Sequence, residues 1–323
     1  MSSLQKISSS VSGPGLLRSC FESSVLVLVL VVLVIVFGNL SERFWSVQKA
    51  VSIANQIPDL TMVAVGMTFV LIAGGIDLSV GSVLALCSAT IGVLMMNYQW
   101  HPGFALLFAI GVGALCGACN GALSVWFGIP SFIVTLGMLE IARGAAYQVT
   151  DSQTVYLGSS LEWISVGGTW GVSPAAIVAI TTVIVGQIIL SRTLLGRYWV
   201  AIGNNEVAAK YSGIDPRPYR WVSFVILGCL CGVGSVMQCS QVSIADPNSA
   251  VGLELSAIAA AVIGGTSLLG GRGSVVQTFL GVLVIAVLQT GLASIGTTDP
   301  MKRIITGSVI VLAVVADVLR YRK

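Results

Sequence analysis

The sequence predicts an all-α polytopic membrane protein with about ten transmembrane helices, some of them broken into hairpins. Three observations support this fold class. Of the 323 residues, 55% are hydrophobic and only 9% are charged, and the mean hydropathy is +0.95. So few charged side chains cannot cover a water-soluble globule of this size. Long apolar runs separated by short polar segments are the third observation, and a lipid bilayer accounts for them.

The first apolar run follows a serine-rich segment, 1–23, which we expect to be cytosolic. Residues 25–37 and the three that follow are long enough to cross about 25 Å at about 1.5 Å per residue. The run lacks a cleavage-type end, so we interpret it as a retained helix and not as a signal peptide. The next segment, 41–56, alternates polar and apolar positions around Trp45, which predicts an interfacial helix on the outer face.

Three longer apolar stretches must each contain a break, because one helix of about forty residues would be roughly 60 Å long, twice the hydrocarbon core. The stretches are 58–96, 104–149 and 253–292, and the breaks fall at 73–82 (AGGIDLSVGS), 128–130 (GIP) and 264–274 (GGTSLLGGRGS). The first and third breaks resemble each other loosely, so an internal duplication is one interpretation.

The two glycine-rich breaks are candidate gates because glycine permits unusual backbone dihedrals. Asp77 or Ser79 can cap the helix after the first break, and we interpret Asp77 as a cap and not as a proton carrier. Whether this break lies at a membrane surface or at membrane depth stays open. The candidate gating residues are Gly74, Gly75, Asp77, Ser79, Gly81, Gly264, Gly265, Gly270, Gly271 and Gly273.

Charge distribution orients the predicted spans. The longest polar interruption, 192–220, holds five cations and is therefore expected to be a cytosolic loop. With this loop inside, alternation places 150–173 outside and both ends of the chain, including the tail 321–323, in the cytosol. Eleven lysines and arginines then lie in cytosolic segments and four in outer ones. The span region, 24–320, forms one transmembrane domain.

The middle of the cytosolic loop predicts a short helix over 204–211. Asn204 or Asn205 can cap it, and Glu206 favours the first turn. Gly213 ends the helix, and the prolines that follow prevent its return. A stiff, exposed helix between two spans has a shape that another protein can grip.

One pair of opposite charges lies inside a predicted span. Glu140 and Arg143 are three residues apart, so they can neutralise each other on one helical face. Any charge inside a membrane is a candidate functional group, but we interpret this pair as structural.

No catalytic machinery is evident in the sequence. His101 is the single histidine, and the CxxC pair, Cys116 and Cys119, lies within an apolar run without a second ligand pair. We expect no metal site and no enzyme activity. The motif GxxxxGK[ST] is also missing, so active transport needs an external engine or an ion gradient.

Four segments resemble the membrane permease of bacterial ribose-type ABC sugar importers. They are AVGMTFVLIAGGIDLSVGSVLAL (64–86), PSFIVTLGMLEIARG (130–144), LGRYWVAIGNNEVAAKYSGI (195–214) and ELSAIAAAVIGGTSLLGGRGS (254–274). The likeness covers nearly the whole chain after about residue 24 and does not single out ribose, since permeases for xylose, arabinose, galactose and autoinducer-2 look alike. Two departures concern Asn204, where the family has a second glycine, and Ser256, which stands where the family has an aspartate and puts any role of that aspartate in doubt.

The resemblance implies a type II ABC-importer-like permease that carries a monosaccharide across the bacterial inner membrane. It implies a second permease subunit, identical or different, a cytosolic ATPase that holds ATP and magnesium, and a periplasmic sugar-binding protein that docks on the outer loops. This chain itself would bind no cofactor and no nucleic acid. The residues that would couple it to the ATPase are Gly203, Asn205, Glu206, Ala208, Ala209 and Gly213.

Two other classes stay open at this point. A gradient-driven secondary sugar carrier would transport without an ATPase, and an assembly subunit would not transport at all. A permease for autoinducer-2 is a further alternative within the same family. The sugar, the direction of transport and the identity of the second permease are not determined by the sequence.

Overall fold

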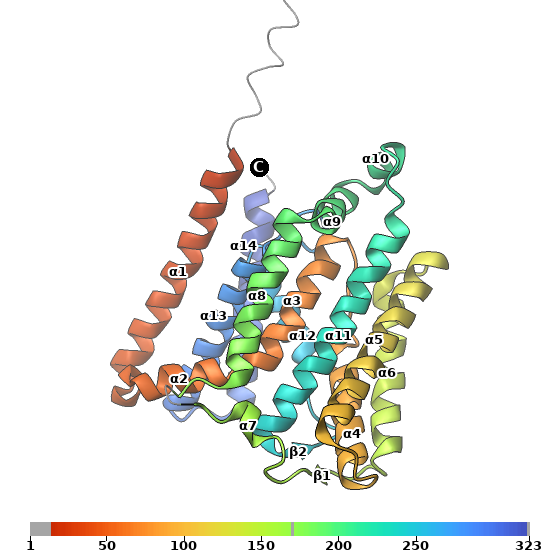
Figure 1. The fold of residues 1–323 in the computed structure, drawn as a ribbon. Coiled ribbons are helices and arrows are strands. Elements are labelled where there is room, and N and C mark those ends of the chain that lie inside the picture. Colours follow the sequence, from red (N-terminus) through yellow and green to blue (C-terminus); the bar gives the residue numbers. More distant parts are fainter. Residues whose placement is uncertain (1–13, 169–170, 322–323) are drawn as a thin grey trace, which may run out of the picture.

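The computed structural model describes residues 14–168 and 171–321, and these form a bundle of helices with one short two-stranded sheet (Figure 1). The first half contains α1 (Pro14–Leu40), α2 (Val47–Gln56), α3 (Pro58–Ile72), α4 (Val80–Met96), α5 (Pro102–Trp126), α6 (Ser131–Val149), β1 (Val155–Tyr156) and α7 (Glu162–Ser165). The second half contains α8 (Pro174–Arg192), α9 (Leu194–Asn204), α10 (Glu206–Tyr211), α11 (Pro216–Val242), β2 (Ile244–Ala245), α12 (Leu253–Ile263), α13 (Val275–Ser294) and α14 (Asp299–Tyr321). Most of the predicted segment 1–23 lies outside the described residues.

The helices confirm an all-α membrane fold. Among the described residues, α5, α8, α11 and α13 are each long and apolar enough to cross a bilayer, and α2 with α3 adds a fifth span if this bent pair counts as one. The shorter or less apolar helices α1, α4, α6, α12 and α14 run beside them (Figure 1), and the total of about ten spans stays a prediction.

The interfacial helix expected over 41–56 corresponds to a short 3-10 turn, Glu42–Trp45, and to α2. Ser46 starts α2 because its Oγ accepts a hydrogen bond from the backbone N–H of Lys49 at 3.2 Å. The chain then bends by 51° into α3, where Pro58 occupies the first turn.

All three predicted breaks are confirmed. Gly74 (φ +81°) follows Ala73, the C-cap of α3, Gly128 (φ +69°) separates α5 from α6, and Gly265 (φ +80°) follows α12. Each lies in the left-handed region, where a side chain would be strained.

Helix α11 forms the centre of the bundle and packs against α5, α3 and α4. Its contact with α5 is made by facing glycines: a Cβ added at Gly232 would lie 2.5 Å from the Cα of Ile110, and one added at Gly117 would lie 3.2 Å from the Cα of Gly228. The backbones therefore approach closely, as small residues four apart predict.

The bundle has two distinct faces. Helix α1 begins and α14 ends at the face that carries α9 and α10, whereas α2, α7 and the β1–β2 pair lie at the opposite face (Figure 1). Val155 pairs with Ala245, and Tyr156 with Ile244, so the loop expected over 150–173 is tied to the segment before α12. The two ends of the described chain thus lie on the same side as the cation-rich loop.

Candidate functional site

The loop at 192–220 contains two helices, and the first of them is missing from the sequence prediction. Thr193 caps α9, and its Oγ1 accepts from the N–H of Gly196 at 3.5 Å. Trp199 is fully buried, stacks on Phe69 with 5.0 Å between ring centroids, and donates its indole N–H to the carbonyl of Tyr219 at 2.7 Å. The small or apolar residues Gly196, Trp199 and Ile202, three apart in the sequence, were the available signal for this helix. Helix α9 therefore holds the start of α10 firmly on the bundle.

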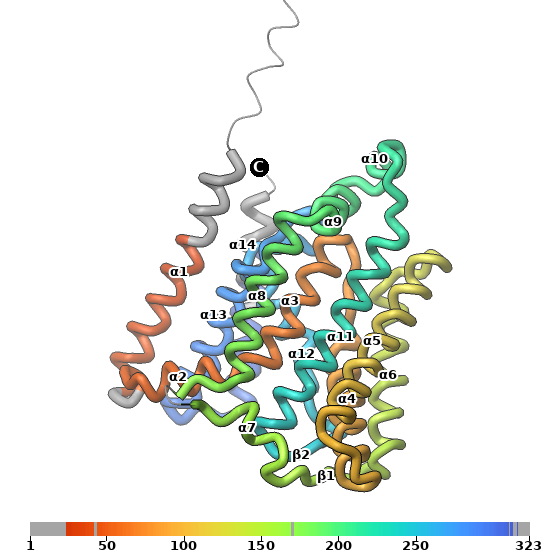
Figure 2. The backbone as a smooth tube through the Cα atoms, in the orientation of Figure 1, coloured from red at the N-terminus to blue at the C-terminus, as the bar shows by residue number. Residues whose placement is uncertain are grey.

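The short helix α10 projects from the bundle (Figure 2). Asn205 is its N-cap, because the Asn205 Oδ1 accepts from the N–H of Ala208 at 3.0 Å. Gly213 (φ +82°) follows the helix, as predicted. The side chains of Val207 and Tyr211 are 60% and 89% exposed, so α10 offers an apolar surface for a partner.

Glu206 connects α10 to the rest of the protein through charge. Its Oε1 accepts from the Nζ of Lys210 at 2.7 Å, and its Oε2 accepts from the Nη1 of Arg220 at 2.6 Å. The hydrogen bond from Lys210 and the charge of Arg220 hold the pKa of Glu206 below its usual value, although partial burial opposes the shift. Glu206 is therefore ionised at neutral pH.

Arg220 carries this connection from α10 to the first break. Its Nε donates to the carbonyl of Ala73, the residue that ends α3, at 2.9 Å. The adjoining Gly74 and Gly75 begin the break. One guanidinium thus bridges α10 and a segment 147 residues away in the chain.

The second break joins the same place. The N–H of Gly271 donates to the carbonyl of Ile72 at 2.9 Å, and the Nδ2 of Asn204 donates to the carbonyl of Gly271 at 3.2 Å. A Cβ added at Gly270 would lie 3.0 Å from the carbonyl oxygen of Gly203. Asn204 is therefore the last residue of α9 and a clamp on the second break, not the cap of α10. In the sequence, the coupling segment and the second glycine-rich break were two separate candidates, and the structure places them in contact.

A polar pocket of about 400 Å³ opens between these elements. Its walls come from α10, the start of α11, the first break and the turn between α5 and α6. Its lining includes Gly74, Ser131, Glu206, Lys210, Arg217 and Arg220. Movement of α10 would change this pocket directly.

The first break is exposed at Gly74, which lines this pocket, and buried at Asp77 and Ser79. Asp77 is 2% exposed, and its Oδ1 accepts from the N–H of Ser79 at 2.8 Å and from the Ser79 Oγ at 2.6 Å. Its Oδ2 accepts from the Nδ2 of Asn120 at 3.1 Å. The side chain of Ser79 makes no capping bond to α4, so that part of the prediction is wrong. Asp77 organises the turn before α4 instead.

Two residues of α6 also hold this break, and the sequence analysis did not find them. Ser131 Oγ accepts from the N–H of Ile76 at 2.9 Å, and Thr135 Oγ1 accepts from the N–H of Leu78 at 3.1 Å. Both are polar residues in the first turns of an otherwise apolar helix, which was the available signal.

The other candidate gating glycines serve close packing. A Cβ at Gly264 would lie 2.5 Å from the carbonyl oxygen of Gln277, and one at Gly273 would lie 2.8 Å from Ile72 Cδ1. A Cβ at Gly81 would lie 2.5 Å from the carbonyl oxygen of Ala250. Gly81 therefore holds the start of α4 against the loop before α12, away from α10.

The predicted pairing of Glu140 with Arg143 is wrong. The Nη1 of Arg143 donates to the carbonyls of Pro247 and Ser249, at 2.5 and 2.9 Å. Glu140 is exposed on another side of α6 and forms no ion pair with Arg143 in the described structure. Three-residue spacing allows such a pair, but two carbonyls of the loop before α12 offer the guanidinium a more buried partner.

Comparisons with known proteins agree with this architecture. The family described as "Branched-chain amino acid transport system / permease component" matches residues 49–314. The chain is 33% identical over 293 residues to the ribose import permease protein of Escherichia coli (strain K12), covering 89% of this chain and 91% of the relative. It is 36% identical over 259 residues to the autoinducer 2 import system permease protein of Enterobacter sp. (strain 638), covering 80% and 75%. It is 30% identical over 309 residues to the fructose import permease protein of Rhizobium meliloti, covering 91% and 85%. No solved structure matches.

Proposed function

The chain belongs to the family of branched-chain amino acid transport system permease components, and we propose that it imports a monosaccharide, ribose or a related sugar, with energy from a separate ATPase. As a permease it is a transport subunit and not an enzyme. Relatives named as permeases for the import of ribose, fructose and autoinducer 2 and for the transport of D-allose support a small polyhydroxylated substrate.

The observation that carries the proposal is the connection from Glu206 through Arg220 to the carbonyl of Ala73. It joins an exposed helix, suited to the grip of an ATPase, to a break in the span region. The proposed coupling residues on this helix and its flanks are Gly203, Asn205, Glu206, Ala208, Ala209 and Gly213.

Each step of the proposed cycle uses a contact in this chain. When the ATPase dimer closes on ATP, it displaces α10, whose exposed Val207 and Tyr211 form the gripped surface. Arg220 transmits the displacement to Ala73, and Asn204 transmits it to Gly271. The two breaks shift together, and the passage opens alternately to the two sides of the membrane. ATP and magnesium bind to the ATPase and not to this chain.

The remaining partners follow from the same proposal. A second permease subunit completes the passage, and a periplasmic sugar-binding protein docks on the face formed by α7 and the β1–β2 pair. In this proposal the protein resides in the bacterial inner membrane with α10 and both termini in the cytosol, which the distribution of cations favours.

Reconstitution tests the proposal. Proteoliposomes that contain this chain, its ATPase and its binding protein should accumulate radiolabelled D-ribose or a related monosaccharide only when ATP is supplied to the ATPase side. Accumulation driven by a proton gradient, with the ATPase omitted, would instead identify a secondary carrier and overturn the proposal.

Autoinducer 2 is the second candidate substrate, because the permease that imports it is 36% identical to this chain. Competition decides between the two. If unlabelled autoinducer 2 blocks uptake at lower concentration than D-ribose does, the substrate assignment moves to autoinducer 2 and the coupling mechanism is unchanged.

A further inference from the structure

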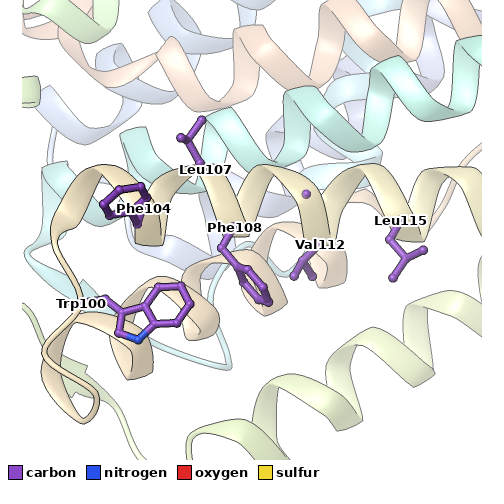
Figure 3. Close-up of a pocket in the computed structure, with 7 residues that line it drawn as sticks. Trp100, Phe104, Leu107, Phe108, Val112 and Leu115 are labelled. Atoms are coloured by element: carbon purple, nitrogen blue, oxygen red, sulfur yellow. The ribbon is translucent and has the colours of Figure 1, made fainter.

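The polar pocket beside α10 differs in chemistry from the groove along α5. The groove is lined by apolar residues and glycine, which suit lipid chains: Trp100, Phe104, Leu107, Phe108, Gly111, Val112 and Leu115 (Figure 3). The polar pocket has a volume of about 400 Å³, and four charged side chains and two serines contribute to its lining. Its volume lies within the roughly 300–1,000 Å³ typical of sites for small molecules. The pocket is therefore large enough to hold a solute.

Positive charge dominates the walls of this pocket. The charged residues that line it are Lys210, Arg217, Arg220 and Glu206, so three cations and one carboxylate leave a net charge of +2. Both carboxylate oxygens of Glu206 are already engaged, one by Lys210 and the other by Arg220. Glu206 therefore does not neutralise Arg217, and the pocket keeps an excess of positive charge.

Arg217 has no acceptor for its guanidinium among the residues that the structure describes. Its side chain is exposed and lines the pocket, and its bond to Asp215 Oδ1, at 3.1 Å, comes from the backbone N–H. Arg217 precedes Arg220 by three residues, so the two side chains lie on the same face of α11. Like charges one helical turn apart repel each other, and an anion between them would remove this repulsion.

Arg220 and Ser131 add donors that have no acceptor in the described structure. Of the five N–H groups of the Arg220 guanidinium, one donates to Ala73 and one to Glu206. The Nη2 of Arg220 lies over the first break, 3.4 Å from the place of a Cβ added at Gly74. The Oγ of Ser131 accepts a backbone N–H of the same break at 2.9 Å, so its own hydrogen can reach another acceptor. Unused donors thus line the pocket from both α6 and α11.

A phosphate group matches this set of donors better than a carboxylate does. A phosphate monoester carries a charge of about −1.5 to −2 at pH 7 and offers three strong acceptor oxygens. An arginine binds such a group with two parallel hydrogen bonds. A carboxylate has one negative charge and two oxygens, so it would leave part of the positive charge of the pocket unbalanced.

We propose that this pocket binds a phosphate group through Arg217, Arg220 and Ser131, and that the bound group slows transport. A small phosphate monoester of the cytosol and the headgroup of an anionic phospholipid both offer this chemistry. The walls of the pocket belong to α10, the start of α11, the first break and α6. A ligand that bridges these walls favours the arrangement in which they lie close, and so it opposes the displacement of α10 in the proposed cycle. The effect on transport rests on the proposed function, whereas the binding of phosphate does not.

The first test measures binding by the full chain in nanodiscs of phosphatidylcholine. At constant ionic strength, inorganic phosphate or D-ribose 5-phosphate should raise the temperature of thermal unfolding in a saturable manner. Arg217→Gln should weaken the apparent affinity at least about tenfold, because it removes hydrogen bonds between charged groups. The matched control is Arg197→Gln, which removes an exposed arginine of α9 that does not line the pocket. Equal losses of affinity in the two variants would show unspecific attraction by charge and overturn the site.

Nanodiscs that also contain phosphatidylglycerol identify the source of the phosphate. The site takes a lipid headgroup if the soluble phosphates have no effect and phosphatidylglycerol stabilises the wild-type chain but not Arg217→Gln. If neither the soluble phosphates nor phosphatidylglycerol act through Arg217, the proposal is overturned.

The second test measures ATP-dependent uptake of radiolabelled D-ribose by the complete complex. D-ribose 5-phosphate is added on the ATPase side, or phosphatidylglycerol is added to the membrane if the first test selects the lipid, and each variant is compared with and without the phosphate. Uptake should fall at least about fivefold in the wild type and in Arg197→Gln, and clearly less in Arg217→Gln.

Two results would overturn the effect on transport. One is equal inhibition of Arg217→Gln and the wild type, and the other is no inhibition of the wild type, as expected if an acidic side chain of the ATPase fills the pocket. If the complex shows no ATP-dependent uptake at all, the proposed function fails, whereas the measurements in nanodiscs still decide on the phosphate site.

Discussion

Removal of the Arg220 guanidinium should uncouple ATP hydrolysis from transport. In Arg220→Gln, the shorter neutral side chain loses the 2.6 Å contact with Glu206 and the 2.9 Å bond to the carbonyl of Ala73. A hydrogen bond to a charged group contributes about 1.5–3 kcal/mol when it is shielded from water. The side chains of Arg220 and Glu206 are 27% and 34% exposed, so the lower end of that range applies to their contact.

At about 1.5 kcal/mol each, the two contacts together stabilise the link between α10 and α3 by about 3 kcal/mol, which corresponds to roughly 150-fold in the population of the linked state. We expect the amount of sugar taken up per ATP hydrolysed to fall at least about tenfold. The ATPase should still bind, because the exposed surface of Val207 and Tyr211 is unchanged. The assay compares uptake and phosphate release in the same proteoliposomes.

Lys210→Ala is the matched control. Lys210 also contacts Glu206, at 2.7 Å, but its side chain is 54% exposed and it reaches no other element through this bond. An exposed pair one helical turn apart contributes about 0.3–0.5 kcal/mol, so uptake per ATP should change by no more than about twofold. A wild-type ratio in Arg220→Gln, or an equal loss in both variants, would refute the coupling path.

Three further predictions concern α10 and α6. Gly213→Val places a β-branched residue at φ +82°, which costs about 1–2 kcal/mol, so uptake should be lost while the amount of protein in the membrane fraction is unchanged; normal uptake would contradict the stop at Gly213. The pKa of Glu206 is lowered from its ordinary value of 4.5, so its stabilisation of α10 is complete above that value and is lost as the pH falls through the lower pKa of the folded protein. Hydrogen exchange of the α10 amides should therefore be protected equally from pH 6 to pH 8 after correction for the intrinsic rate, and Glu206→Gln should reduce protection throughout that interval; a loss of protection between pH 8 and pH 6 would disprove the assignment. Arg143→Met leaves two carbonyls without their donor and should lower the free energy of unfolding in detergent by about 2 kcal/mol, whereas Glu140→Gln should leave it unchanged. If both variants lower the free energy of unfolding and their effects are not additive in the double variant, Glu140 and Arg143 interact and this assignment is wrong.

The positions of the helices could be predicted because they depend on local composition. Pro58 and Pro174 each begin a helix where an apolar run starts, and Gly74, Gly128 and Gly265 each lie where a stretch too long for one span must break. Helix α11 begins at Pro216, inside the segment expected to be a loop. The cap at Asn205 and the stop at Gly213 are likewise short-range features. Helix α9 was missed because its polar residues resemble a loop, and its stability comes from burying Trp199 against Phe69.

The partners of the buried polar side chains could not be predicted in the same way. Arg143 has an acidic residue one turn away but bonds to carbonyls about one hundred residues later in the chain. Asp77 accepts a hydrogen bond from Asn120 of α5, 43 residues later in the chain. Spacing shows which pairs can meet on one helix, and it says nothing of which neighbouring element offers a better-placed acceptor.

The sequence by itself determined the class of the protein, its family, the order of its spans and the exposed helix between two of them, because bilayer thickness and backbone hydrogen bonding act on consecutive residues. Only the tertiary structure decided that this helix connects through Arg220 to Ala73 and through Asn204 to Gly271, and that Glu140 stands unpaired on the outward face of α6. Those contacts depend on how the helices pack and on which way each side chain points, and packing joins residues that no local pattern relates.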